Sequence, residues 1–239
     1  MATFIRELSF LMQFTLIFCA SSPIQKCRLS DESCLKSTAQ SFVQTFVAGI
    51  PEFGTEVLDV LRVDFIKVDL AGLKLTLRDA NIEGMKNTII DKISIDQNKK
   101  QIQLFYHMDI SVKAKYKAGG KLLFLPISGD GLSTIKLKNL QLQATYPFEI
   151  VKNAEGKDVI ELKSYKYSYK VKDHANFHLT NLFNGNKQLS DVMLTFMNQN
   201  WKMLTEEFGT PVLDQPQQRI FNSMAAYLKA QPLEEIAVI

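Results

Sequence analysis

The sequence predicts an α+β protein: a long C-terminal helix wrapped by a strongly curved antiparallel sheet with long, bent strands, and a short helix before the sheet. Three observations support this prediction. Apolar residues recur at helical spacing over 188–230, they alternate at strand spacing over 57–179, and a short amphipathic segment precedes the first strand. No stretch within 27–235 has the composition of a linker, so we expect one domain over 23–239.

The first 22 residues have the features of a cleaved signal peptide. Arg6 supplies the positive charge that precedes the apolar core of a signal peptide, and residues 8–20 form that apolar run. Ala20 and Ser22 are small residues that suit cleavage after Ser22. A membrane anchor is the alternative, but the run is shorter than the ~20 apolar residues that span a bilayer. We therefore expect a secreted, extracellular protein without stable membrane insertion.

Two cysteines, Cys27 and Cys34, remain after the signal is removed. An even pair in an oxidising compartment favours a disulfide. The alternative is a metal pair, which needs two further soft ligands, and the sequence offers none nearby. We expect the disulfide.

The short helix follows this pair. Its apolar stripe runs from Leu35 to Ile50, Ser33 can cap its N-terminus, and Gly49 and Pro51 end it. A helix this short, with one apolar face, suits a lid or an end-plug.

Strand spacing is clearest over 102–116, where eight apolar residues alternate with seven others. This pattern predicts a strand of about 16 residues, on the order of 50 Å, which must twist and coil. A phase slip at Lys138-Asn139 predicts a β-bulge. Short turns between successive strands indicate an antiparallel meander. Turn-forming residues are found at 96–98, 118–120, 129–131 and 153–156.

The C-terminal helical pattern has two parts. The first stripe runs from Leu189 to Phe208 and the second from Ile220 to Leu228. Between them, Gly209 and Pro211 interrupt the pattern and Pro216 offers a second helical start. The sequence leaves open whether the two parts form one collinear rod.

Five short features follow one another in a specific order and spacing across nearly the whole mature chain. They are the Cys27 and Cys34 pair, Gly49-Ile50-Pro51, and the segments 120–131, 181–186 and 198–201. Together they resemble the takeout / juvenile hormone-binding protein family of secreted insect proteins. A single cysteine pair is more similar to the takeout branch than to hormone carriers with a second bridge.

The resemblance implies a tunnel between the helix and the curved sheet that holds a lipophilic ligand. Terpenoid hormones, fatty acids and other isoprenoids are the ligand classes it implies, with roles in feeding, circadian rhythm, chemosensation or hormone transport. The predicted inward faces supply the candidate lining residues: Leu104, Tyr106, Met108, Ile110, Tyr165, Tyr167, Met193, Phe196, Met197 and Trp201.

Each group of candidates also has a simpler interpretation. The methionines can fill a core, although their deformable side chains also suit a pocket that accepts varied ligands. The tyrosine row at Tyr165, Tyr167 and Tyr169 can pack across strands, or one hydroxyl can donate a hydrogen bond to a ligand. Trp201 can line the tunnel or close its end.

Catalytic signatures are missing from the sequence: no Gly-x-Ser-x-Gly, P-loop or His-Glu-x-x-His motif occurs. His174 and His178, with Asp173 or His107, could bind zinc, but two polar strand positions are the simpler interpretation. The net charge of +3 is too small to indicate nucleic acid. We expect no metal, no cofactor and no enzyme.

Two hypotheses for function remain. The first is a secreted, monomeric, non-enzymatic carrier that binds a lipophilic small molecule, because large apolar faces occur without catalytic motifs. The second is a secreted interaction or signalling protein with a solid core, whose function lies on its outer polar surface. The sequence does not name a receptor or protein partner for either.

Overall fold

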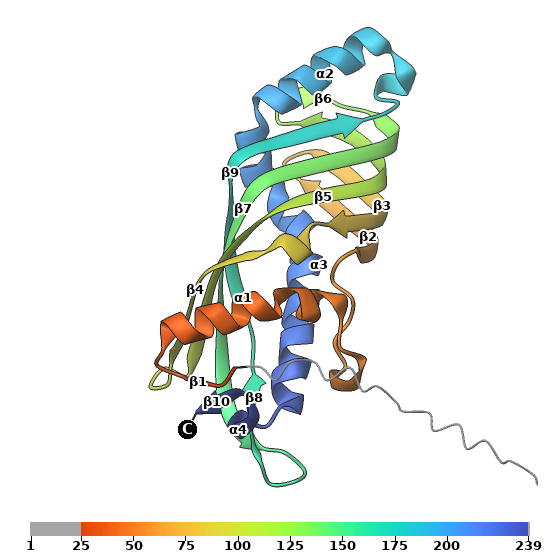
Figure 1. Ribbon diagram of the computed structural model, residues 1–239. Helices are drawn as coiled ribbons and strands as arrows, with labels where there is room; N and C mark the ends of the chain where they lie inside the picture. The colour runs from red at the N-terminus through yellow and green to blue at the C-terminus, as the bar shows by residue number, and fades with distance from the viewer. Residues whose placement is uncertain (1–24, 239) are drawn as a thin grey trace, which may run out of the picture.

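The computed structural model describes residues 25–238 (Figure 1). It confirms the predicted α+β architecture, in which an antiparallel sheet curls around a long C-terminal helix and a short helix crosses one end. The expected signal peptide, 1–22, lies outside the described residues.

Two very long strands, β5 and β7, pair along most of their length and form the spine of the main sheet. β3 and β4 pair with opposite ends of β5, while β9 and β8 pair with opposite ends of β7. β2 and β9 are therefore opposite edges of the curled sheet. The strands are β2 (Leu61–Leu70), β3 (Leu73–Glu83), β4 (Ile89–Asp96), β5 (Gln101–Leu122), β6 (Leu125–Pro126), β7 (Gly129–Lys152), β8 (Asp158–Leu162) and β9 (Lys166–Leu179).

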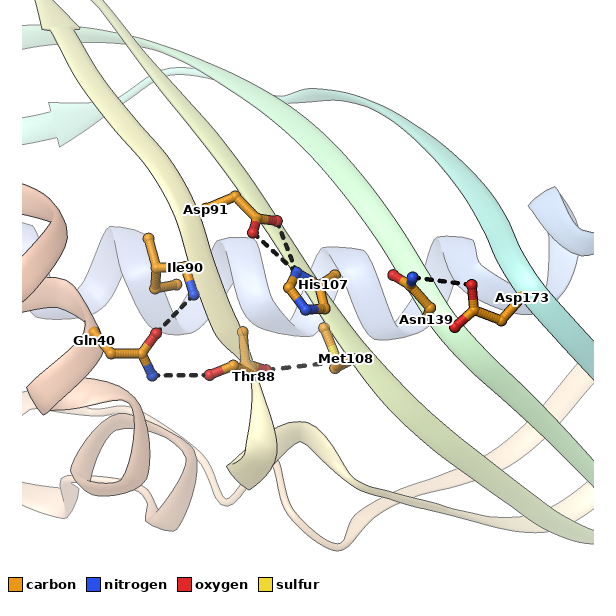
Figure 2. Close-up of polar contacts among 8 residues, drawn as sticks. All are labelled: Gln40, Thr88, Ile90, Asp91, His107, Met108, Asn139 and Asp173. Carbon is orange, nitrogen blue, oxygen red and sulfur yellow. Dashed lines mark hydrogen bonds and ion pairs between the residues drawn. The ribbon is translucent and has the colours of Figure 1, made fainter.

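The sheet bends where the pairing register shifts, and the predicted bulge at Lys138-Asn139 is confirmed. β5 shifts against β7 at the same level, around Asp109. Asn139 has a φ of 52°, a left-handed conformation that asparagine tolerates. Its backbone N–H donates to Asp109 Oδ1 at 2.7 Å. Its side-chain amide donates to Asp173, as Figure 2 shows. The extra residue lies in β7 where it pairs with β5, and in β9 where it pairs with β7, so two neighbouring strands are bulged at one level of the sheet.

Two of the expected turns are wrong. Residues 118–120 continue β5 and 129–131 begin β7, so the chain reverses at Leu123-Phe124 instead. A Cβ on Gly120 would stand 2.2 Å from the carbonyl oxygen of Gly72. This glycine is therefore needed for a close approach of the β2–β3 turn, not for a reversal.

The N-terminal helix, α1 (Glu32–Ala48), is capped by Asp31, whose side chain accepts from Cys34 N at 3.0 Å. The expectation that Ser33 caps it is wrong, because the capping oxygen comes from the residue that precedes the helix. The predicted Cys27–Cys34 disulfide is confirmed, with Cα atoms 5.7 Å apart. β1 (Cys27–Arg28) pairs in parallel with β10 (Ala237–Val238), so the two ends of the described chain meet.

The C-terminal helix breaks at Asn200, not at the residues where the sequence pattern is interrupted. α2 (Lys187–Gln199) ends there and α3 (Trp201–Ala230) runs without a break through Gly209, Pro211 and Pro216. α3 contacts both edges of the sheet, and this packing offsets the backbone hydrogen bonds that proline removes. A short helix, α4 (Leu233–Ile236), and three 3-10 turns, η1 (Pro51–Phe53), η2 (Met85–Asn87) and η3 (Phe183–Gly185), complete the described elements.

Candidate ligand-binding cavity

A cavity of about 260 Å³ lies between α1, the β4–β5 part of the sheet and the C-terminal half of α3. No Lys, Arg, His, Asp or Glu side chain lines it among the described residues. We call it the large cavity. Apolar side chains from all three elements form its wall, among them Phe42, Val43, Ile93, Leu104, Ile220 and Met224.

Helix α1 covers this cavity and is attached to the sheet by Gln40. The Gln40 Nε2 group donates to the Thr88 carbonyl at 3.0 Å, and its Oε1 accepts from Ile90 N at 2.8 Å (Figure 2). On the other side, Phe42 packs against Tyr227 of α3 with ring centroids 5.0 Å apart. The cover is therefore held by a bidentate amide on one side and by aromatic packing on the other.

Two neutral polar side chains reach the apolar wall from the sheet side. Thr88 Oγ1 donates to the Met85 carbonyl at 2.6 Å. The Tyr106 hydroxyl donates to Gln217 Oε1 of α3 at 3.1 Å. Burial raises the pKa of Tyr106 to about 12, and the bond to Gln217 offsets part of that rise. The cavity therefore offers uncharged hydrogen-bonding groups and no counter-ion.

A second cavity of about 100 Å³ lies farther along α3, between its N-terminal half and the β3–β5–β7–β9 part of the sheet. Its wall is also apolar and includes Leu77, Val171, Leu204 and Phe208. A space of only about 20 Å³ lies between the two cavities. It shares Met85, Met108 and Ile220 with the large cavity, and Ile110, Val112, Val212 and Leu213 with the second.

Five of the ten predicted lining residues contribute to these spaces. Leu104, Tyr106 and Met108 line the large cavity, while Ile110 and Met197 line the second. This placement follows from the concave face of β5, where Tyr106, Met108 and Ile110 are successive inward-pointing residues.

The other five predicted residues lie outside these three spaces. Tyr165 packs on Phe221 of α3, with ring centroids 4.9 Å apart. Phe196 is half-buried against Phe124, and Trp201 lies beside His174 with ring centroids 5.6 Å apart. The remaining two are Met193, which is buried, and Tyr167, which bonds to Asp214.

Sequence reasoning missed Gln217, the partner of Tyr106. A signal was present: Gln217 lies four residues after Leu213 and three before Ile220, so it falls on the apolar stripe of the helix. A polar residue on such a face requires a buried partner. The sequence predicts a lid or an end-plug for the α1 stripe, and the structure places Phe42, Val43 and Phe46 of that stripe in the cavity wall.

The residues of the zinc alternative have other neighbours. His107 pairs with Asp91 at 2.9 Å, and Asp173 accepts from Asn139 at 3.2 Å (Figure 2). Among residues 25–238, no group of three His, Cys, Asp or Glu side chains is placed to hold a metal ion. In the same part of the chain, no helix combines the length and apolarity needed to cross a bilayer.

The curved sheet, the enclosed helix and the apolar cavity define a class of small α+β proteins that bind lipophilic molecules. The family model described as Haemolymph juvenile hormone binding protein (JHBP) matches residues 8–237. The chain belongs to this family.

Three relatives illustrate the similarity. Takeout 1 of Epiphyas postvittana has a crystal structure with a TM-score of 0.88 and 46% identity, covering 90% of this chain and 100% of that one. The circadian clock-controlled protein daywake of Drosophila melanogaster is 34% identical over 77% of this chain and 75% of its own. The juvenile hormone-binding protein of Manduca sexta is 24% identical over 55% of this chain and 58% of its own.

Proposed function

We propose that this protein is a secreted, non-enzymatic carrier that holds a neutral lipophilic small molecule, such as a terpenoid ester or another isoprenoid, in the large cavity. The observation that carries this proposal is an apolar cavity of about 260 Å³ with uncharged polar groups on its wall. Binding would be driven by removal of ligand surface from water, at ~25 cal/mol per Å². The printed name of the Manduca sexta relative supports a juvenile-hormone-like terpenoid as the first ligand to test.

A neutral ligand is favoured over an ionised fatty acid. A carboxylate in the large cavity would lose its hydration without gaining a cationic partner, because no Lys, Arg or His of the described chain lines the wall. The hydroxyl protons of Thr88 and Tyr106 are already donated within the protein. An alcohol can therefore donate a hydrogen bond to either hydroxyl oxygen, and an ester enters the cavity without an unpaired charge. The proposal therefore selects among the ligand classes that the family resemblance implies.

The apolar run at 8–20 supports secretion with cleavage after Ser22. The mature protein would then be one domain, 23–239, acting outside the cell as a monomer. Sequestration and delivery of the ligand would need no covalent step.

The test is binding by delipidated protein of a juvenile-hormone-like terpenoid ester, a ubiquinone analogue, and a matched pair of a long-chain fatty acid and its methyl ester. We expect the neutral compounds to raise the melting temperature, and the methyl ester to bind at least tenfold more tightly than the free acid at pH 7. Mass spectrometry of an organic extract of the purified protein should also show a co-purified neutral lipid.

A matched pair of variants tests whether the ligand binds in the large cavity. Ala39 of α1 lines the large cavity, and Ala48 of the same helix is exposed. Ala39→Phe should fill the cavity and abolish binding, while Ala48→Phe should leave binding unchanged. A clean extract together with no binding of any of the compounds would instead support an interaction protein with a solid core.

A further inference from the structure

The interior along α3 is interrupted, and the interruption lies between Tyr106 and Gln217. Tyr106 lines the large cavity, and Gln217 lines the small space that separates it from the second cavity. Tyr106 comes from the concave face of β5 and Gln217 from the facing side of α3, so their hydrogen bond crosses the space between sheet and helix. Beyond this bond lies the small space of about 20 Å³, and beyond that space lies the second cavity of about 100 Å³.

The burial of both side chains favours the Tyr106–Gln217 hydrogen bond. Tyr106 is 4% exposed and Gln217 is 5% exposed. If the two side chains separated, a buried hydroxyl and a buried amide would each lose a partner in an apolar environment, which is costly. Met108 adds bulk at the same place, because its side chain borders both the large cavity and the small space.

We propose that the Tyr106–Gln217 hydrogen bond is a crossbar that closes the inner end of the large cavity and so sets the maximum length of the ligand. This inference rests on the proposed carrier function. With the crossbar in place, a ligand occupies the large cavity alone. Without it, the three spaces join into one channel along α3, and a longer apolar chain can pass into the second cavity.

The test uses a series of saturated fatty-acid methyl esters of increasing chain length and isothermal titration calorimetry on full-length mature protein. Each methylene that enters an apolar cavity should strengthen binding by about fourfold. For the wild type we expect this gain to stop at a definite chain length. For Gln217→Ala we expect the gain to continue for several further carbon atoms before it stops.

Leu204→Ala is the matched control, because Leu204 lines the second cavity and is not part of the crossbar. It removes a comparable side chain from α3 and should leave the wild-type length limit in place. If Gln217→Ala does not fold, Gln217→Ser serves the same purpose, because the serine hydroxyl is too short to reach Tyr106. A longer limit in the Gln217 variant, with an unchanged limit in Leu204→Ala, supports the crossbar.

Two results would overturn the inference and leave the carrier function standing. The first is a wild type whose affinity keeps rising through the whole series. The second is a Gln217 variant that folds, binds and keeps the wild-type limit. Failure of the wild type to bind a methyl ester of any length would overturn the proposed function and the crossbar together.

Discussion

The Tyr167 hydroxyl of β9 donates to the Asp214 carboxylate in the middle of α3, with the two oxygens 2.6 Å apart. The next residue of the helix, Gln215, donates from Nε2 to the Phe65 carbonyl of β2 at 2.8 Å. β9 and β2 are opposite edges of the curled sheet. α3 therefore joins both edges at one level and closes the roll.

Tyr167→Phe should lower the free energy of unfolding by about 1–2 kcal/mol, because it removes a hydrogen bond to a charged group and leaves the ring packing in place. Ser168→Ala is the control, since Ser168 is exposed on the same strand. Urea denaturation of both variants measures the difference. Equal stability of the two variants would show that the bond contributes nothing to closing the roll.

Alkaline pH should unfold the protein through its tyrosines. All seven have raised pKa values in the folded state, with burial as the largest cause, and Tyr106, Tyr116 and Tyr227 are raised to about 12. In the unfolded chain the tyrosine pKa is about 10. The unfolded state therefore releases protons first, so stability is unaffected below pH ~10 and falls as pH rises from ~10 towards ~12.

Absorbance at 295 nm measures this titration. The native protein should show little phenolate at pH 10 and a cooperative rise above it, while the same protein in concentrated urea should be half-ionised near pH 10. A native curve that overlies the urea curve would contradict the burial of these rings.

Replacement of Cys27 and Cys34 together by Ser should lower the free energy of unfolding by about 2–4 kcal/mol, because the unfolded chain gains the entropy that the bridge removes. The bridge attaches the start of α1 to β1, so the loss should be largest at the cover of the large cavity. Reductant should produce the same loss in the wild type and none in the variant. Two thiols that alkylate freely in unreduced secreted protein would exclude the bridge.

Ile110→Asp should destabilise the protein by several kcal/mol, because Ile110 is 6% exposed and the new carboxylate would have no cationic partner in the second cavity. Lys117→Asp is the control, since Lys117 is exposed on the outer face of the same strand. Ser111 is a poorer control, because its hydroxyl oxygen is buried and has no hydrogen-bond partner in the described part of the chain. Equal melting temperatures would mean that the inward face of β5 is wrongly assigned.

Ligand binding should leave the emission of Trp201 nearly unchanged. Trp201 is half-buried beside His174 and borders none of the three spaces along α3. A neutral ligand at 100 times its Kd should still stabilise the fold by ~2.7 kcal/mol. Saturable fluorescence changes at the same ligand concentrations would instead place the ligand next to the indole.

Local patterns were sufficient to predict the backbone of most elements. Alternation over 102–116 predicted the core of β5, because the side-chain direction of a strand follows its two-residue period. Glycine was a less reliable predictor of turns. The pair at 119–120 continues β5. Gly120 is needed there because the Gly72 carbonyl comes close to it, and not for a turn. Pro211 and Pro216 were equally unreliable as signs of a helix end. Both lie inside α3, which packs on both edges of the sheet.

The sequence by itself determined most of the side chains that face the interior, since apolar periodicity records the face of each helix and strand. Leu189, the first residue of the predicted helical stripe, is an exception at 50% exposed. Only the tertiary structure decided where that interior stays empty. Leu104 and Trp201 both carry inward periodicity, yet Leu104 lines the large cavity and Trp201 does not, because empty space depends on the separation of sheet and helix. Tyr106 and Gln217 lie 111 residues apart in sequence. Their bond exists because the curvature of β5 brings the hydroxyl to α3, and no local pattern encodes that distance.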